Sequence, residues 1–396
     1  MSWSHSQQFT AAADAPTAEQ AGRPVRQASP LAAMSAAALF ATNRPLMEHA
    51  VAAVQQAVAQ VPTDIDWLQF QTGVTRYAAN PTPTSRPEYP ILATAGRTTL
   101  RSAGGSGTPI VLVPSMVNRG YVLDLHPGAS LVEHLRNNGH HVLLIDWGTP
   151  TEATVETLEH IITTGLEPLL HAAISQFGPL QLFGYCMGGL LALAAAVRLN
   201  SSSPIANSPT PIARLALAAM PWDFSTTTSA QHMQLAKPLL EPWLGAQTLV
   251  PPEVMAHYFW SLDPWSPIRR LMAYGQESDP ARLAQMTALE DWLNDGLPLD
   301  GPVAREMLLD WYTANTPLKG EWLIGGTPIL PANVNCPLWV CITQNDILVP
   351  LNSSLPFIGQ AKGAQVVMAD TGHIGLVCGR RAKERLYDPL TLWLKS

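Results

Sequence analysis

The stretch that decides the fold is Leu180-Gln181-Leu182-Phe183-Gly184-Tyr185-Cys186-Met187-Gly188-Gly189-Leu190. Its apolar start predicts a buried strand, and the Leu- and Ala-rich run that follows predicts a helix. Cys186 stands at the turn between them, where flanking glycines permit a sharp change of direction. A helix that starts just after Cys186 points its N-terminal N–H groups at the sulfur, which favours thiolate. The stretch therefore predicts a cysteine nucleophile, and a structural cysteine in a glycine-rich turn is the competing interpretation.

Composition narrows the class of protein. The 396 residues allow one large α/β domain with an insertion, or two domains. A net charge of −7 and only 13% charged residues argue against a nucleic-acid partner. The four cysteines lack metal-ligand or disulfide spacing, so we expect no metal, no cofactor and a cytoplasmic location. No run reaches the roughly 18 apolar residues that a membrane helix needs, so no transmembrane segment is expected.

The chain divides into four parts by pattern. Residues 1–30 predict a disordered leader, and 31–88 an N-terminal helical segment followed by a proline-rich linker. Strands and helices alternate over 89–222 and 331–396, which is typical of a mostly parallel central sheet flanked by helices. Together with the cysteine elbow, this pattern predicts an α/β-hydrolase fold. Strands are expected at 109–114, 141–147, 180–183, 213–219, 337–343 and 364–369, and helices at 130–138, 155–177, 190–199 and 382–394.

Residues 223–330 have a different character. We expect a mostly helical insertion there that forms a lid over the carboxyl ends of the strands, where ligands of this fold class bind. Tryptophans gather in and beside it, either as core residues or as contacts for an apolar acyl substrate. They are Trp222, Trp243, Trp260, Trp265, Trp292, Trp311 and Trp322.

A cysteine nucleophile needs a histidine base and an acid that orients it. Elbow enzymes place them in the order nucleophile, acid, histidine. Asp346 follows a predicted strand, and His373 lies in the expected loop after the last strand, so both match that order. Asp223, after the preceding strand, is a rival acid. The oxyanion hole is expected from the backbone N–H of Met187 and that of Met116 or Val117.

Several segments together resemble the polyhydroxyalkanoate synthases. They are Val113-Pro114-Ser115-Met116-Val117-Asn118-Arg119-Gly120-Tyr121-Val122-Leu123-Asp124-Leu125, Trp292-Leu293-Asn294-Asp295-Gly296-Leu297-Pro298, Trp311-Tyr312-Thr313-Ala314-Asn315, Asp346-Ile347-Leu348-Val349-Pro350 and Gly372-His373-Ile374-Gly375. The resemblance covers roughly residues 90–396 and implies a short-chain-length member or a synthase-like paralogue. One departure is Ile347, where that family commonly has His after the acid.

The resemblance implies that Cys186, Asp346 and His373 form the synthase triad. Cys186 would take an (R)-3-hydroxyacyl group from coenzyme A, a substrate rather than a cofactor, and build a polyester. The implied partners are 3-hydroxyacyl-CoA, the polyester chain, and either a second synthase subunit or a homodimer. The implied location is the cytoplasm, at the surface of polyester granules.

Other functions stay open at this point. Dienelactone hydrolases resemble the elbow equally well, but lack a lid of this size. A thioesterase or polyester depolymerase differs mainly in whether water or an alcohol removes the acyl group from Cys186. A granule-associated scaffold protein that has kept the fold is the alternative without catalysis.

Overall fold

The computed structural model describes residues 61–80, 87–201 and 210–396. The predicted leader over 1–30, most of the expected helices before residue 61 and part of the proline-rich linker lie outside these ranges. Among the described residues, no helix is both long and apolar enough to cross a membrane.

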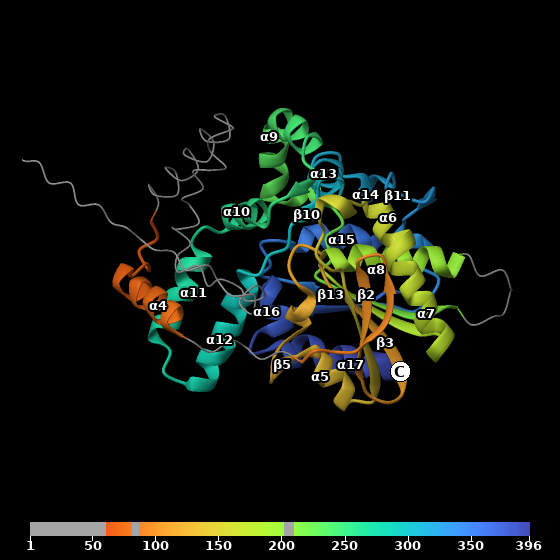
Figure 1. Ribbon diagram of the computed structural model, residues 1–396, viewed down its shortest axis with the longest axis horizontal. Coiled ribbons are helices and arrows are strands. Elements are labelled where there is room, and N and C mark those ends of the chain that lie inside the picture. The colour runs from red at the N-terminus through yellow and green to blue at the C-terminus, as the bar shows by residue number, and fades with distance from the viewer. Residues whose placement is uncertain (1–60, 81–86, 202–209) are drawn as a thin grey trace, which may run out of the picture.

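A central sheet of eight strands organises the molecule (Figure 1). The order across the sheet is β1-β2-β6-β3-β7-β8-β13-β14. β2 pairs antiparallel with β1 and β6, and the other neighbours are parallel. The strands are β1 Ile91–Ala95, β2 Thr98–Gly104, β3 Thr108–Val113, β6 His140–Asp146, β7 Leu180–Tyr185, β8 Ile212–Ala218, β13 Leu338–Thr343 and β14 Gln365–Ala369. This order with one antiparallel strand near the edge is the α/β-hydrolase fold, which confirms the expected class.

Helices cover both faces of the sheet, as parallel sheets require. One face packs against α6 Leu158–His160, α7 Glu167–Phe177, α8 Met187–Ser201 and α15 Leu351–Gln360. The other packs against α5 Leu131–Asn137, α16 His373–Cys378 and α17 Asp388–Lys395. Neighbouring strand residues alternate between the faces, since Val111 joins the first core and Leu112 the second. Short elements at the strand ends are η2 Gly120–Leu123, β4 Asp124–His126, β5 Ala129–Ser130, η3 Glu152–Thr154, η5 Phe224–Thr226 and η7 Pro331–Asn333.

Some predicted elements differ from those observed. The strands β1 and β2 were not predicted individually. The single helix expected at 155–177 is divided by the π-helical turn η4 Ile161–Leu166, and the closing helix by η8 Lys383–Tyr387. His373 was expected in a loop but is the first residue of α16, directly after the loop that follows β14.

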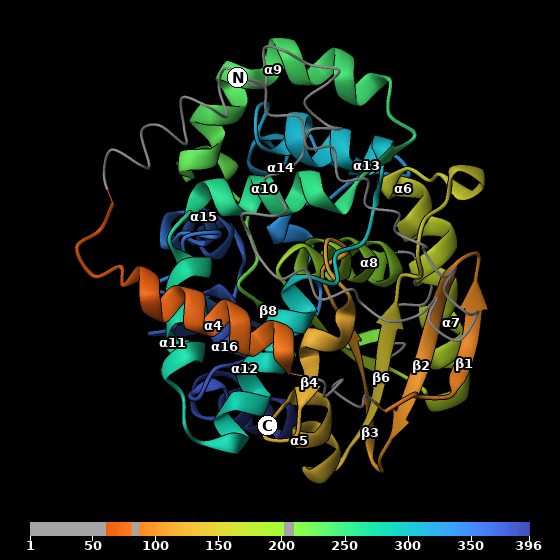
Figure 2. The ribbon, with the colours of Figure 1, turned by 60° about the vertical axis from the view of Figure 1, so that its left-hand side comes forward.

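Helices dominate the stretch between Phe224 and β13, which we call the cap. Its only strands are pairs of two residues, β9 Leu249–Val250 with β10 Leu299–Asp300 and β11 Leu323–Ile324 with β12 Thr327–Pro328. The cap helices are α9 Thr228–Gly245, α10 Pro252–Leu262, α11 Ser266–Gln276, α12 Pro280–Leu293, α13 Gly301–Arg305, the π-helical turn η6 Glu306–Trp311 and α14 Thr316–Lys319. Figures 1 and 2 show α9, α10 and α13 gathered beyond one end of the sheet.

The helix α4 Trp67–Ala79 precedes the sheet in sequence but packs on the cap (Figure 2). The side chain of Asp66 caps its start by accepting the N–H groups of Leu68 and Gln69. At its crossing with α11, a Cβ on Gly73 would lie 1.8 Å from the carbonyl oxygen of Leu271. Only glycine permits this approach, which lets the α4 and α11 backbones touch.

Candidate active site

Cys186 occupies the turn between β7 and α8. Its φ is +54°, a left-handed conformation that costs a non-glycine residue energy and recurs at functional sites. The turn is compact because α8 lies against the end of β3. A Cβ on Gly188 would lie 2.2 Å from the carbonyl oxygen of Val113, so this position requires glycine. The predicted strand–turn–helix elbow is therefore present, with the half-buried Cys186 thiol at its tip.

His373 and Asp346 lie in contact beyond the ends of β14 and β13. The Nδ1 of His373 is 2.7 Å from Oδ2 of Asp346. That same oxygen accepts from the hydroxyl of Thr343 at 2.8 Å, and Oδ1 accepts from the N–H groups of Leu348 and Val349, both at 2.9 Å. Four donors thus hold the carboxylate in one orientation, with one oxygen directed at the imidazole.

Electrostatics favour charged His373 and Asp346. Burial acts to lower the pKa of His373, but the charges of Asp346 and Cys186 and hydrogen bonds to both side chains raise it well above its usual value. Burial raises the pKa of Asp346, yet the charge and hydrogen bond of His373 bring it below its usual range. The arrangement can support a thiolate–imidazolium pair, the form in which a cysteine attacks carbonyl carbon.

The rival acid Asp223 lies elsewhere. Its Oδ1 accepts from the N–H and hydroxyl of Ser225 and from the side-chain amide of Asn315, at 2.6–2.9 Å. Asn315, in a left-handed conformation, also accepts the N–H of Phe224 through Oδ1. Asp223 therefore ties the start of the cap to the segment after η6, and the structure brings Asp346, rather than Asp223, against the histidine.

Sequence reasoning missed two supporting residues. The hydroxyl of Tyr185 donates to the backbone oxygen of His373 at 3.1 Å, and the two rings lie 5.1 Å apart. Thr343 buttresses Asp346 as described above. The only sequence signals were proximity, since Tyr185 precedes the nucleophile and Thr343 ends the strand before Asp346. Such signals do not distinguish these residues from ordinary core positions.

Two of the predicted oxyanion donors, Met187 and Val117, line the cavity that contains Cys186. Met187 opens α8, so its N–H has no intrahelical acceptor. Met116 and Val117 are both buried, and Met116 does not line the cavity. We therefore take Val117 rather than Met116 as the candidate second donor, and the oxyanion hole itself stays a prediction.

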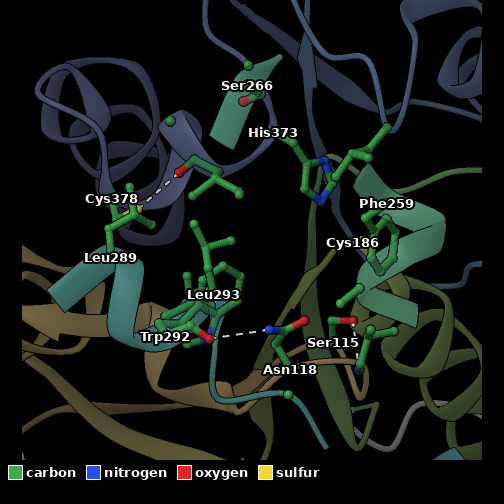
Figure 3. Close-up of a pocket in the computed structure, with 18 of the residues that line it drawn as sticks. Ser115, Asn118, Cys186, Phe259, Ser266, Leu289, Trp292, Leu293, His373 and Cys378 are labelled. Carbon is green, nitrogen blue, oxygen red and sulfur yellow. Dashed lines mark hydrogen bonds between the residues drawn. The ribbon is translucent and has the colours of Figure 1, made fainter. Parts of the chain in front are cut away.

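A cavity of about 610 Å³ lies over these residues, between the sheet and the cap. This volume is in the usual range for small-molecule sites. Figure 3 shows Cys186, His373 and Phe259 on one side and Leu289, Trp292 and Cys378 across from them. Phe224, Met255, Met307 and Tyr312 add further apolar lining. Such a site suits a substrate with an apolar acyl part.

The tryptophans in and beside the cap differ in burial and in whether they line the cavity. Trp222 and Trp322 are buried and do not line the cavity, so they are core residues. Trp292 and Trp311 are buried and also line the cavity. Trp243 and Trp265 are half-buried away from the lining, and the side chain of Trp260 is outside the described part.

No family model matches the chain. The poly(3-hydroxyalkanoate) polymerase subunit PhaC of Haloferax mediterranei is 26% identical over 294 residues, which are 72% of this chain and 58% of that protein. The PhaC subunit of Thiocystis violacea is 25% identical over 296 residues, 73% of this chain and 81% of that protein. The chain is thus similar to poly(3-hydroxyalkanoate) polymerase subunits over nearly three quarters of its length. This confirms the resemblance seen in the motifs.

Solved structures of similar fold include a lipase and an esterase. A monoacylglycerol lipase from Paleococcus ferrophilus covers 74% of this chain and 98% of its own, with a TM-score of 0.48 and 17% identity. A thermophilic esterase from Thermogutta terrifontis covers 79% and 98%, with a TM-score of 0.45 and 18% identity. The strand order described above establishes the fold independently of them.

Proposed function

We propose that this relative of the polymerases is an acyltransferase in which Cys186 takes a 3-hydroxyacyl group from coenzyme A and passes it into a polyester. The observation that carries the proposal is the half-buried thiol at the elbow, in one cavity with a histidine whose Nδ1 is 2.7 Å from Asp346. The names of the polymerase relatives support a 3-hydroxyalkanoate unit as the group that is transferred.

The first step is acylation. The thiolate of Cys186 attacks the thioester carbonyl carbon, and the oxygen becomes an oxyanion that the N–H groups of Met187 and Val117 are proposed to bind. The carbon–sulfur bond to coenzyme A then breaks, and His373 gives its proton to the leaving thiolate. Exchange of one thioester for another is nearly balanced in energy, which is a chemical reason for sulfur rather than oxygen at residue 186.

The second step transfers the acyl group. A 3-hydroxyl oxygen attacks the Cys186 thioester, and its proton passes to His373 while an ester bond forms. The carbon–sulfur bond breaks and the thiolate returns. The cavity lining of Phe224, Met255, Phe259 and Met307 favours acyl carbons over water. That supports an alcohol rather than water as the acceptor.

The test incubates purified protein with 3-hydroxybutyryl-CoA and follows thiol release and insoluble polyester together. We expect both with the natural protein and neither with Cys186→Ala. Cys336→Ala is the matched control, because Cys336 is a half-buried cysteine outside the cavity. Full activity in Cys186→Ala would disprove the cysteine mechanism.

The alternatives give distinct results in the same assay. Thiol release without polyester indicates a thioesterase, and hydrolysis of added polyester indicates a depolymerase. Opening of a dienelactone without thiol release indicates a dienelactone-type hydrolase. No turnover, with binding to isolated granules, indicates a scaffold protein.

The proposal extends to partners and location. We propose that the enzyme works in the cytoplasm at the granule surface, as a homodimer or with a second subunit. Sedimentation with polyester granules tests the location. The lag before thiol release tests the assembly. A lag that shortens at higher protein concentration indicates a homodimer, and a lag that shortens when a candidate subunit is added indicates a second subunit.

A further inference from the structure

Two motifs that the sequence singled out separately lie against each other in the structure. We call residues 115–119 the oxyanion loop and residues 292–297, at the end of α12, the cap segment. The indole N–H of Trp292 donates to the backbone oxygen of Arg119 at 2.8 Å, and the Asn118 amide donates to the oxygen of Trp292 at 3.3 Å (Figure 3). Asn118 also forms an isolated β-bridge with Gly296.

An ion pair reinforces this contact. The Nε of Arg119 lies 2.9 Å from Oδ1 of Asp295, and the Tyr121 hydroxyl donates to Oδ2 at 3.0 Å. The side chain of Asp295 is 15% exposed and that of Arg119 42%. One carboxylate oxygen of Asp295 therefore binds Arg119, the last residue of the oxyanion loop, and the other binds Tyr121 just after the loop. A charge-assisted pair of this geometry is stronger than a neutral hydrogen bond.

Val117, the favoured oxyanion donor, is held from the same side. Its carbonyl oxygen accepts from Leu297 N–H at 3.4 Å, and its own N–H makes a long 3.4 Å bond to the Ser115 hydroxyl. The core holds the start of this loop, because the Pro114 oxygen accepts the indole N–H of Trp147 at 3.0 Å and the side chains of Met116 and Val117 are buried. Beyond this core packing, the hydrogen bonds of the Val117 and Arg119 backbone oxygens and of the Asn118 amide run to the cap.

We propose that Asp295 is a positioning residue that couples the cap to the oxyanion hole. By holding Arg119 and Tyr121, it keeps the Val117 N–H in the direction that an oxyanion on the Cys186 adduct requires. Acyl transfer is then fast only while the cap segment is docked. The inference rests on the proposed cysteine mechanism, and it adds a regulatory contact between the cap and the chemistry.

The proposal separates two reactions of the same thiol. Acylation by p-nitrophenyl acetate forms a bond from the sulfur to the carbonyl carbon and expels p-nitrophenolate through a tetrahedral oxyanion. Alkylation by iodoacetamide displaces iodide from a saturated carbon, and no oxyanion forms. Loss of an oxyanion donor therefore slows only acylation, whereas loss of the thiolate slows both.

The experiment measures both rates in Asp295→Asn, with the Cys186→Ala rate subtracted. Removing an oxyanion donor outright costs about 10²–10³ in rate, so a displaced donor is expected to slow acylation roughly tenfold or more. Alkylation should stay within about twofold. Arg119→Gln should give the same loss, and the double variant little more, because the two residues form one interaction.

Asp279→Asn is the matched control. Asp279 caps the other end of α12, and asparagine caps equally well, so both rates should stay unchanged. An unchanged acylation rate in Asp295→Asn would overturn the proposal. So would an equal fall in both rates, which would indicate a merely structural role, or a natural protein that is alkylated but not acylated.

The outcome is separable from that of the proposed function. Because p-nitrophenyl acetate is not a coenzyme A thioester, the ratio of the two rates reports on the loop and cap whatever the natural acceptor is. Absence of polyester from 3-hydroxybutyryl-CoA, with the Asp295 effect intact, would refute only the polymerase assignment.

Discussion

Asp346→Asn is the sharpest test of the assignment of the acid. In the natural protein, Oδ1 of Asp346 accepts two backbone N–H groups at 2.9 Å, while Oδ2 accepts from His373 Nδ1 at 2.7 Å. Asparagine has a single oxygen. The two backbone donors hold that oxygen in the Oδ1 place, so the new NH₂ group faces the imidazole.

The side-chain NH₂ group of asparagine can only donate a hydrogen bond. Nδ1 of His373 must therefore lose its proton in order to accept that hydrogen bond. The proton moves to Nε2, the nitrogen left to serve Cys186, and the imidazole can no longer accept the thiol proton. General-base catalysis contributes about 10²–10⁴ in rate. The expected loss in acylation is therefore about 3–5 kcal/mol of transition-state free energy, at 1.36 kcal/mol for each tenfold.

Stopped-flow measurement of acylation by p-nitrophenyl acetate supplies the rate. Alkylation by iodoacetamide should fall as well, because the thiolate loses its base. Asp223→Asn is the control, since Asp223 is equally buried and bonds Ser225 and Asn315 instead of the histidine. It should lose less than about tenfold. The reasoning fails if the acylation rate of Asp346→Asn falls by less than about tenfold, or if the rate of Asp223→Asn falls further than that of Asp346→Asn.

Other predictions concern pH and packing. The pKa of His373 is raised in the folded state. The stability that its positive charge contributes is therefore fully present at pH values below the pKa of the unfolded state, and it is lost as the pH rises through the pKa of the folded state. Urea unfolding at about pH 6 and about pH 10 should therefore show a larger alkaline loss of stability for the natural protein than for His373→Gln; equal losses would contradict this. Gly188→Ala should cost about 1–3 kcal/mol of unfolding free energy, because its Cβ would meet Val113 oxygen at 2.2 Å. Gly359 lies in α15 with open space around it, so Gly359→Ala should stabilise the folded protein by about 0.5–1 kcal/mol. Thermal unfolding that finds Gly359→Ala less stable than Gly188→Ala would refute the packing argument. Gly73→Ala should separate α4 from α11 and expose new protease cleavage sites there, and an unchanged digestion pattern would count against the tight crossing.

The sequence predicted the parts of the fold whose signal is local. The apolar run before Cys186 and the glycines around it specify a strand, a turn and a helix within one short stretch. The strand that ends at Thr343 and the loop before His373 were placed by the same kind of pattern. Chain order then sufficed to name Cys186 and His373 as neighbours.

Pairings between distant segments could not be predicted in this way. Asp346 and Asp223 both follow buried strands, and only the three-dimensional position of His373 distinguishes them. The contact of Asp295 with Arg119 joins residues 176 positions apart, and the crossing of Gly73 with α11 depends on two backbones meeting. Neither leaves a periodic trace in the sequence. The strands β1 and β2 are a milder case, since a short edge hairpin has a weak pattern.

Mass spectrometry of the Cys186 peptide after brief exposure to 3-hydroxybutyryl-CoA tests the central claim most directly. The account predicts that Cys186 carries one or more hydroxybutyryl groups in thioester linkage, removable by hydroxylamine, and that the peptides of Cys336, Cys341 and Cys378 carry none. An unmodified Cys186 in protein that releases coenzyme A, or an acyl group on another residue, would contradict it.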